Sequence, residues 1–248
     1  PLGEGTCFRP RGLHKRCFAL AKLELLITMN MTKLAIFDLD GTLLDTVGDL
    51  GQATNFALGQ CGFPSRPTND YYTLCGRGIY NLFRGAVPAG QDTEENIKKM
   101  AGHFLAYYDK HMCDKTLPYP GIPEMLKKIT AAGVTPALAS NKYQAGAEKL
   151  ISHYFGDIHF LKILGQREGQ PIKPDPAIVH QIMAEMPGIQ LDEVIYIGDS
   201  DVDMQTGANA KVKTVGVTWG FRSREELEAG HPWRIATTAE ELASFILE

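Results

Sequence analysis

The chain has 248 residues, of which 44% are hydrophobic, and a formal net charge of −4. This length is enough for one large or two modest domains with a buried core. The charge balance is mildly acidic and no basic stripe is visible, so nucleic acid is not an expected partner. No apolar run approaches the roughly 18 residues that span a membrane, so a membrane is not expected either.

Residues 1–30 differ from the rest of the chain. They begin at Pro1, which cannot start translation, and their apolar part is interrupted by Lys22 and Glu24, which argues against a signal peptide. Met29 and Met31 stand directly before the first expected strand, where a natural start would fall. We therefore expect residues 1–30 to be an upstream or added segment that is poorly ordered and lies outside the fold.

Residues 33–37 form an apolar run that is too short for a helix and predicts a buried strand of a parallel sheet. The run stops at Asp38 and Asp40, followed by Gly41 and Thr42. Open α/β sheets bind ligands at the carboxyl ends of their strands, and two clustered acids call for a cation between them. This stretch therefore predicts a metal site. The alternative is a plain turn, capped by Asp38, in which Gly41 has a positive φ.

The strand pattern is absent from Thr46 to about Val134, and helices are expected over 49–59, 79–85 and 93–112. The last helix has Asp92 and Glu95 in capping-box spacing. One of its faces carries Ile97, Met100, Ala101, Phe104 and Tyr108. An insert of this size is not a simple crossover. We expect a helical cap domain over 47–118 and an α/β core over 31–46 and 119–248.

From residue 119 onward, strands and helices alternate. Strands are expected over 134–139, 158–164, 194–197 and 212–217. Between them we expect helices, one with Asp175 as N-cap and Pro176 at its first position, and a final helix from Ala239. Regular alternation of this kind predicts a Rossmann-like parallel sheet flanked by helices, with right-handed crossovers.

Polar residues follow four of these segments at the edge where such sheets bind ligands. They are Asp38 and Asp40, Ser140 and Asn141, Lys173, and Asp199 with Asp203. This series resembles the four motifs of the haloacid dehalogenase superfamily, and residues 31–248 resemble its phosphoglycolate phosphatase-type members. The Gly-x-Gly at 76–78 and the Trp219-Gly220 pair point to that subgroup.

The resemblance implies a role for each matching position. Asp38 would be the nucleophile that forms an aspartyl-phosphate, and Asp40 the general acid and base. An acid at position 40 favours phosphate esters, because the dehalogenases and phosphonatases of the superfamily lack one there. Lys173 would place a positive charge beside the phosphate oxygens and Asp38. The alternative for Lys173 is a solvated loop lysine.

The implied cofactor is Mg²⁺, held by Asp38, Asp199 and the backbone carbonyl of Asp40. Asp203 is a further candidate ligand or orients the ligands, and the alternative is that it only closes a capping box with Ser200. The residues expected to bind the substrate's phosphate are Thr42, Ser140 and Asn141. A helix cap is an equally open reading of Asn141.

Recognition of the rest of the substrate is expected from the loop Gly76-Arg77-Gly78. This loop would close over the site and bind a carboxylate through its amides or the Arg77 fork. The alternative is a turn with a solvent-facing arginine. The histidines show no metal-ligand spacing, and the five scattered cysteines argue against a zinc site or disulfides and for a reducing, cytoplasmic location.

Together these residues predict a Mg²⁺-dependent phosphatase acting on a small phosphorylated metabolite, with 2-phosphoglycolate preferred. Two other functions stay open: a phosphomutase of the same superfamily, similar to beta-phosphoglucomutase, and a non-catalytic binding protein on the same fold. The sequence is compatible with a monomer or a homodimer.

Overall fold

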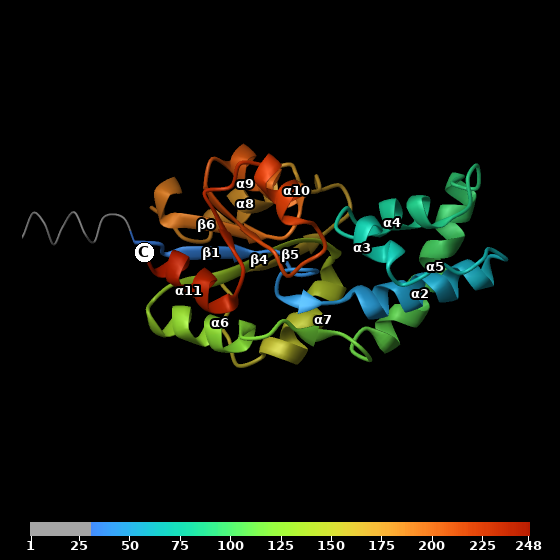
Figure 1. Cartoon of the computed structure of the whole chain (residues 1–248), viewed down its shortest axis with the longest axis horizontal. Helices are drawn as coiled ribbons and strands as arrows, with labels where there is room; N and C mark the ends of the chain where they lie inside the picture. Colours follow the sequence, from blue (N-terminus) through green and yellow to red (C-terminus); the bar gives the residue numbers. More distant parts are fainter. Residues whose placement is uncertain (1–30) are drawn as a thin grey trace, which may run out of the picture. The chain divides into compact units, whose positions relative to one another are not determined.

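The structure, a computed structural model, describes residues 31–248, so the expectations for residues 1–30 lie outside it. Its centre is a six-stranded parallel sheet with the order β5-β4-β1-β6-β7-β8 (Figure 1). The strands are β1 (Leu34–Phe37), β4 (Thr135–Tyr143), β5 (Ile163–Gln166), β6 (Val194–Gly198), β7 (Lys213–Val217) and β8 (Arg234–Ala236). The predicted α/β fold is confirmed. The strand order reverses direction between β1 and β6, which is where sheets of this kind hold their ligands.

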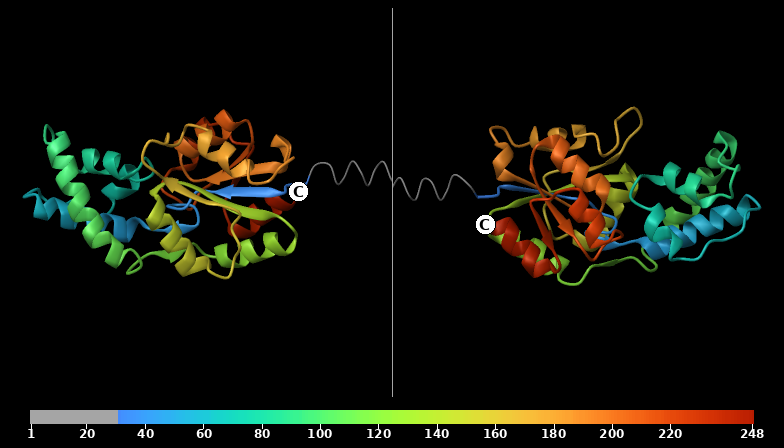
Figure 2. Two further views of the ribbon diagram at one scale, coloured as in Figure 1. Left: turned by 180° about the vertical axis from the view of Figure 1, so that it is seen from behind. Right: turned by 45° about the horizontal axis from the view of Figure 1, so that its top comes forward.

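Helices cover both faces of this sheet (Figures 1 and 2). They are α6 (Ile122–Ala131), α7 (Gln144–Phe155), α8 (Ala177–Met183), the 3-10 helix η1 (Leu191–Glu193), α9 (Asp201–Ala210), α10 (Arg224–Ala229) and α11 (Ala239–Leu247). Alternate residues of β1 point to opposite faces, as in any strand. Phe37 packs in the cluster that contains Ile122 of α6, and Ile36 in the cluster that contains Val179 of α8. Two cores therefore hold β1 at the centre of the sheet.

A group of helices lies beyond the carboxyl ends of the strands (Figure 1). It comprises α2 (Val47–Gln60), α3 (Asp70–Leu74), α4 (Ile79–Ala86) and α5 (Glu94–His111). The chain enters and leaves this group through the short antiparallel strands β2 (Leu44–Asp45) and β3 (Leu117–Pro118). The buried residues of α5 are those of the predicted apolar face. The helices thus lie where a cap was predicted, and the division into domains at 47–118 stays a prediction.

Several boundaries differ from the predicted ones. Strand β4 continues through residues 140–142 to Tyr143. Strand β5 overlaps only the last two residues of the predicted 158–164 segment and continues to Gln166. The Asp92–Glu95 capping box is wrong, because the Thr93 hydroxyl accepts the N-terminal hydrogen bond of α5. Helix α8 begins one residue later than predicted. The sequence analysis did not predict β2, β3, β8 or α10, which are too short to show a period.

None of the helices within residues 31–248 has the length and apolar character needed to cross a membrane.

Candidate active site

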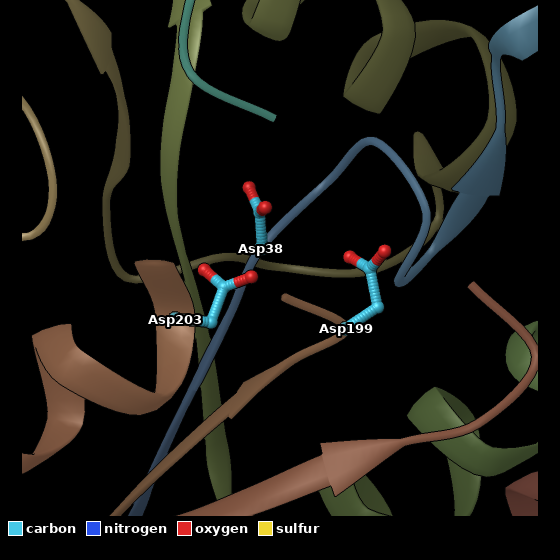
Figure 3. A group of neighbouring side chains, drawn as sticks. All are labelled: Asp38, Asp199 and Asp203. Carbon is cyan, nitrogen blue, oxygen red and sulfur yellow. The ribbon is translucent and has the colours of Figure 1, made fainter. Parts of the chain in front are cut away.

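Three carboxylates meet where β1 and β6 end (Figure 3). Asp38 directly follows β1, Asp199 directly follows β6, and Asp203 lies in the first turn of α9. All three side chains are buried, and each offers an oxygen within 4.8 Å of the others. Because β1 and β6 are adjacent parallel strands, the fold itself brings together acids from distant parts of the chain.

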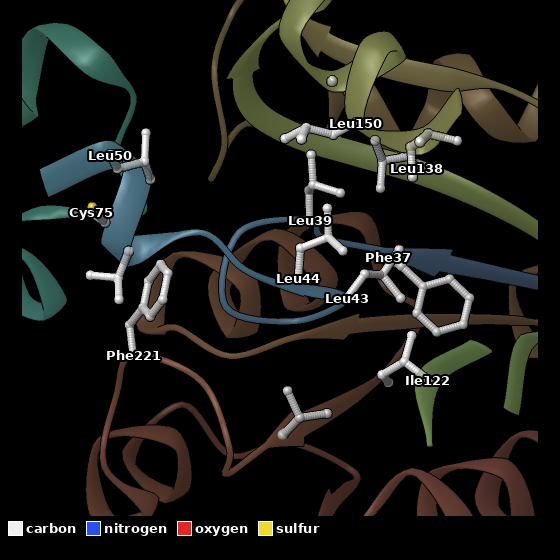
Figure 4. Packing of buried hydrophobic residues seen from close by; sticks show 14 of the residues in the cluster. Phe37, Leu39, Leu43, Leu44, Leu50, Cys75, Ile122, Leu138, Leu150 and Phe221 are labelled. Atoms are coloured by element: carbon white, nitrogen blue, oxygen red, sulfur yellow. The ribbon is translucent and has the colours of Figure 1, made fainter. Parts of the chain in front are cut away.

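The loop that carries Asp38 and Asp40 is anchored by leucines. Leu39, Leu43 and Leu44 are fully buried and point into the hydrophobic cluster around Phe37 (Figure 4). The amides of Leu43 and Leu44 both donate to the carbonyl of Leu39, which closes a tight turn. Gly41 has φ +86° in this turn, as the sequence suggested. The turn alternative is therefore correct for the glycine, and the same turn presents the two acids.

Burial makes the acidic cluster electrostatically unfavourable. It raises the pKa of Asp38 to about 7, an effect that Lys173 opposes and that Asp203 and Asp40 increase. Burial, together with Asp203 and Asp38, raises the pKa of Asp199 well above its ordinary value. Clustered carboxylates with raised pKa values lack compensating positive charge. The cluster therefore favours a cation.

Lys173 supplies part of that charge. Its Nζ lies 3.0 Å from Asp38 Oδ1 and 2.7 Å from Asp203 Oδ1, and it also donates to the Tyr196 hydroxyl. Burial alone would lower the pKa of Lys173, but Asp203 and Asp38 outweigh it and raise this pKa well above its ordinary value. The ammonium is therefore charged. The alternative of a solvated loop lysine is wrong, since the side chain is 1% exposed.

The carboxylate of Asp203 is saturated with donors from the protein. Its Oδ1 accepts from Lys173 and Tyr196, and its Oδ2 accepts from the amide and the hydroxyl of Ser200. The predicted capping box is confirmed. A carboxylate oxygen has about two acceptor positions, so Asp203 is better suited to orienting Lys173 than to binding a cation. The sequence analysis missed Tyr196, because it lies within the predicted strand 194–197 and was counted there as part of the apolar pattern.

Asp38 and Asp199 keep free acceptor positions and so fit a metal ion. Each Asp199 oxygen accepts one hydrogen bond, Oδ1 from the Thr42 hydroxyl and Oδ2 from the Phe221 amide. Asp38 Oδ1 accepts from Leu39 and contacts Lys173, whereas Oδ2 receives no donor from the described residues. Carboxylate oxygens are the hard donors that Mg²⁺ prefers. This buried acidic cluster also lacks sufficient positive charge, which a bound cation would supply.

Glycines leave the space that Asp199 occupies. A Cβ on Gly41 would lie 2.3 Å from Asp199 Oδ2, and one on Gly220 would lie 2.2 Å from Asp199 Cβ. Any larger residue at either position would displace the carboxylate. Trp219, next to Gly220, donates its indole N–H to the carbonyl of Thr42. This hydrogen bond joins the segment after β7 to the loop after β1.

Asp40 is paired with a lysine that the sequence analysis left unassigned. Lys142 Nζ lies 3.0 Å from Asp40 Oδ1 and donates to the Tyr108 hydroxyl of α5 at 2.8 Å. The signal that could have identified Lys142 is its position near Ser140. Both residues follow the predicted strand 134–139, at the edge where such sheets bind ligands. The pairing of β4 with β5 is irregular between Ala139 and Tyr143, so strand periodicity does not fix the direction of the Lys142 side chain, and only the structure shows it.

Asn141 connects two segments of the site. Its Oδ1 accepts from the Lys173 amide, and its Nδ2 donates to the carbonyls of Gly76 and Lys173. The helix-cap alternative is wrong, because α7 begins at Gln144 and no side chain caps it. The Ser140 hydroxyl accepts from the amide of Lys142. The phosphate-binding role of Ser140 and Asn141 stays a prediction. The same holds for Thr42, whose hydroxyl donates a hydrogen bond to Asp199 in this structure.

A single narrow cavity of ≈ 30 Å³ brings most of the predicted residues together. The core contributes Asp38, Asp40, Ser140, Asn141, Lys142 and Tyr143, and the helical insert contributes Leu50, Cys75, Gly76, Gly78, Ile79 and Leu82. The side facing the insert is largely apolar. Room on this scale holds a few water molecules.

Arg77 is not among the residues that line this cavity. Its guanidinium donates to Asp201 at the start of α9, at 2.7 Å, and its side chain is 57% exposed. Arg222 reinforces the same junction by donating to the carbonyls of Tyr72 and Cys75. The structure thus places Arg77 as a link between the insert and the core. A role for its side chain in binding substrate stays a prediction.

Comparison with known proteins identifies relatives of the whole described region. Residues 35–217 match the family model of the haloacid dehalogenase-like hydrolases. The phosphoglycolate phosphatase of Psychrobacter arcticus is 30% identical over 223 residues, covering 87% of this chain and 96% of the relative. That of Haemophilus influenzae is 28% identical and covers 81% and 92%. The crystal structure of a predicted phosphoglycolate phosphatase from Haemophilus somnus has a TM-score of 0.79 at 28% identity, covering 86% of this chain and 98% of that one.

Proposed function

The chain belongs to the haloacid dehalogenase-like hydrolases and is a hydrolase of phosphoric monoesters, and we propose that it removes the phosphate from 2-phosphoglycolate with the help of Mg²⁺. The observation that carries this proposal is the arrangement around Asp38. A buried carboxylate at the end of the central strand contacts a charged lysine and lies beside Asp199, which has free acceptor positions. The phosphoglycolate phosphatases among the relatives support the choice of substrate.

In the proposed reaction, the Asp38 carboxylate attacks phosphorus and the bond to the ester oxygen breaks. Asp40 gives its proton to that oxygen, so glycolate leaves. Asp40 then takes a proton from a water molecule, whose oxygen attacks the aspartyl-phosphate and releases inorganic phosphate with Asp38 restored. The cycle consumes one ester and one water molecule, and it returns the carboxyl groups of Asp38 and Asp40 to their starting states.

The surrounding residues stabilise charge during both steps. Lys173 lies against Asp38, where its ammonium offsets the repulsion between the incoming phosphate and the carboxylate. Asp203 and Tyr196 hold that ammonium in place. Ser140 lines the same cavity and would donate its hydroxyl to a phosphate oxygen. Asp38, Asp199 and the Asp40 carbonyl would hold Mg²⁺, which when bound supplies positive charge to the cluster and the phosphate.

The helical insert would enclose the substrate. Gly76 and Gly78 line the cavity, and both have positive φ values that present the backbone of this loop to the site. A closed site excludes bulk water while the aspartyl-phosphate is present. The proposed cap domain over 47–118 would therefore close the site around the bound substrate.

A hydrolysis screen in Mg²⁺ over phosphorylated metabolites tests this function. We expect 2-phosphoglycolate to be among the best substrates and the reaction in ¹⁸O-labelled water to place the label in inorganic phosphate. Transfer of the phosphoryl group to a second sugar hydroxyl, without label, would identify a phosphomutase instead. Absence of phosphate release from every ester would favour the non-catalytic alternative.

A further inference from the structure

The cavity beside Asp38 is lined by the ammonium group of Lys142, which the proposed reaction does not use. Its side chain is 2% exposed and lines the cavity. Its hydrogen-bond partners within residues 31–248 are the Asp40 carboxylate, at 3.0 and 3.3 Å, and the Tyr108 hydroxyl at 2.8 Å. Lys142 thus joins the proposed general acid to a helix of the insert.

These partners leave one N–H of Lys142 for a ligand. An ammonium has three donors in a tetrahedral arrangement. The two Asp40 oxygens are much closer together, as seen from Nζ, than the tetrahedral spacing of two N–H bonds, and Oδ2 is the more distant at 3.3 Å. We therefore count the carboxylate as the acceptor of one shared donor, and Tyr108 as the acceptor of the second. The third N–H has no acceptor among the described residues. A buried N–H of a charged group is costly without an acceptor, which makes it a binding position for an anion.

Tyr108 determines where this donor points. Tyr108 is fully buried on α5. The Lys142 ammonium donates a hydrogen bond to its hydroxyl and lies 4.8 Å from the centre of its ring. Contact with a tyrosine face stabilises a cation. The lysine is thereby held between Asp40 on the core and Tyr108 on the insert, and its remaining N–H is directed by both.

The position of Lys142 matches the length of a short substrate. Asp40 is the group that would protonate the ester oxygen, and Lys142 contacts Asp40 directly. In 2-phosphoglycolate one methylene separates the ester oxygen from the carboxylate. When Asp40 contacts the ester oxygen of 2-phosphoglycolate, the Lys142 ammonium beside Asp40 is therefore within reach of the substrate's carboxylate. The neighbouring side chains of Leu50, Ile79 and Leu82 are apolar and offer an anion no hydrogen bond.

We infer that Lys142, positioned by Tyr108, binds the carboxylate of the substrate and selects phosphate esters of short hydroxy acids over neutral esters. This inference rests on the proposed phosphatase function. It assigns to a core lysine the recognition that the sequence analysis expected from Arg77, whose guanidinium is engaged with Asp201.

The test compares kcat/KM for 2-phosphoglycolate and ethyl phosphate, which has the same two-carbon chain without the carboxylate. In Lys142→Met both values fall, because Asp40 loses a partner. The value for 2-phosphoglycolate should fall about ten- to hundredfold further, mainly through KM, as expected when a charge-assisted hydrogen bond is lost. Lys142→Arg keeps the charge and should restore part of the preference.

Two further variants separate recognition from folding. Tyr108→Phe removes only the hydroxyl and should reduce the preference for 2-phosphoglycolate several-fold in the same direction, so it decides the matter if Lys142→Met does not fold. Lys162→Met is the matched control, since Lys162 is a half-exposed surface lysine paired with Glu185. It should leave the ratio of the two kcat/KM values unchanged.

The outcomes distinguish this inference from the function on which it rests. Equal losses on both esters in Lys142→Met and Tyr108→Phe would mean that Lys142 only positions Asp40, and would overturn the inference. A wild-type enzyme that hydrolyses both esters equally well would also overturn it, while leaving the phosphatase function standing. Failure of the wild type to hydrolyse either ester would reject the proposed function and the inference with it.

Discussion

Lys173 Nζ lies 3.0 Å from Asp38 Oδ1, although one residue follows β1 and the other lies in the loop before α8. Both side chains are almost completely buried, at 1% and 6% exposure. The pair does not stand alone, because Asp203 accepts from the same ammonium at 2.7 Å. Loss of the lysine would leave two buried carboxylates without their shared cation, which links the stability of this site to its chemistry.

The first prediction concerns the nucleophile. Asp38→Asn replaces an oxygen by nitrogen without changing volume, so the fold should persist while turnover falls at least about a thousandfold. Phosphate release in Mg²⁺ measures the activity, and circular dichroism with thermal unfolding measures the fold. Asp157→Asn, at an exposed acid paired with Lys127, is the matched control and should retain full activity. Turnover of Asp38→Asn within tenfold of wild type would remove Asp38 from the mechanism.

The second prediction concerns Lys173. Lys173→Met should lower the free energy of unfolding by about 3–5 kcal/mol, because it leaves Asp38 and Asp203 buried without their shared cation. Urea denaturation of the metal-free protein measures this loss, and activity should disappear as well. Lys127→Met removes an exposed ion pair instead and should change stability far less. A similar, small effect of both substitutions would contradict the buried pairing.

The third prediction concerns the metal. Mg²⁺ should stabilise the wild-type protein by about 2.7 kcal/mol at one hundred times its dissociation constant, because it binds the folded acids only. Thermal unfolding with Mg²⁺ and with a chelator measures this difference without any substrate. The stabilisation should vanish in Asp199→Asn and persist in Asp157→Asn. If Asp199→Asn responds to Mg²⁺ like the wild type, the ion binds elsewhere.

The fourth prediction concerns Arg77. Because its guanidinium contacts Asp201 rather than lining the cavity, Arg77→Ala should reduce kcat/KM for 2-phosphoglycolate and for a neutral aryl phosphate by the same factor. Asp201→Asn removes the partner of this exposed pair and should have an effect of similar size on both substrates. Steady-state kinetics on the two substrates decides the question. A loss confined to 2-phosphoglycolate would instead support the carboxylate-binding role that the sequence suggested.

The predicted site residues Asp38, Asp40, Lys173 and Asp199 could be placed from the sequence because each follows a strand or precedes a helix of an alternating pattern. Carboxyl ends of parallel strands meet at one edge of a sheet, so the pattern alone placed Asp38 and Asp199 at the same edge. Their proximity was implied by the family resemblance, and the structure shows that β1 and β6 are adjacent strands. The apolar face of α5 and the positive φ of Gly41 followed from periodicity and turn chemistry in the same way.

The contacts of Lys142, Tyr108, Asp203 and Arg77 were decided only by the tertiary structure. Lys142 meets Asp40 and Tyr108 because a helix of the insert packs over the end of β4, and no local pattern encodes that distance. Asp203 is saturated because β6, α9 and the Lys173 loop converge on it. Sequence periodicity reports which face of an element is buried, whereas the partner of a buried polar group depends on how separate elements dock.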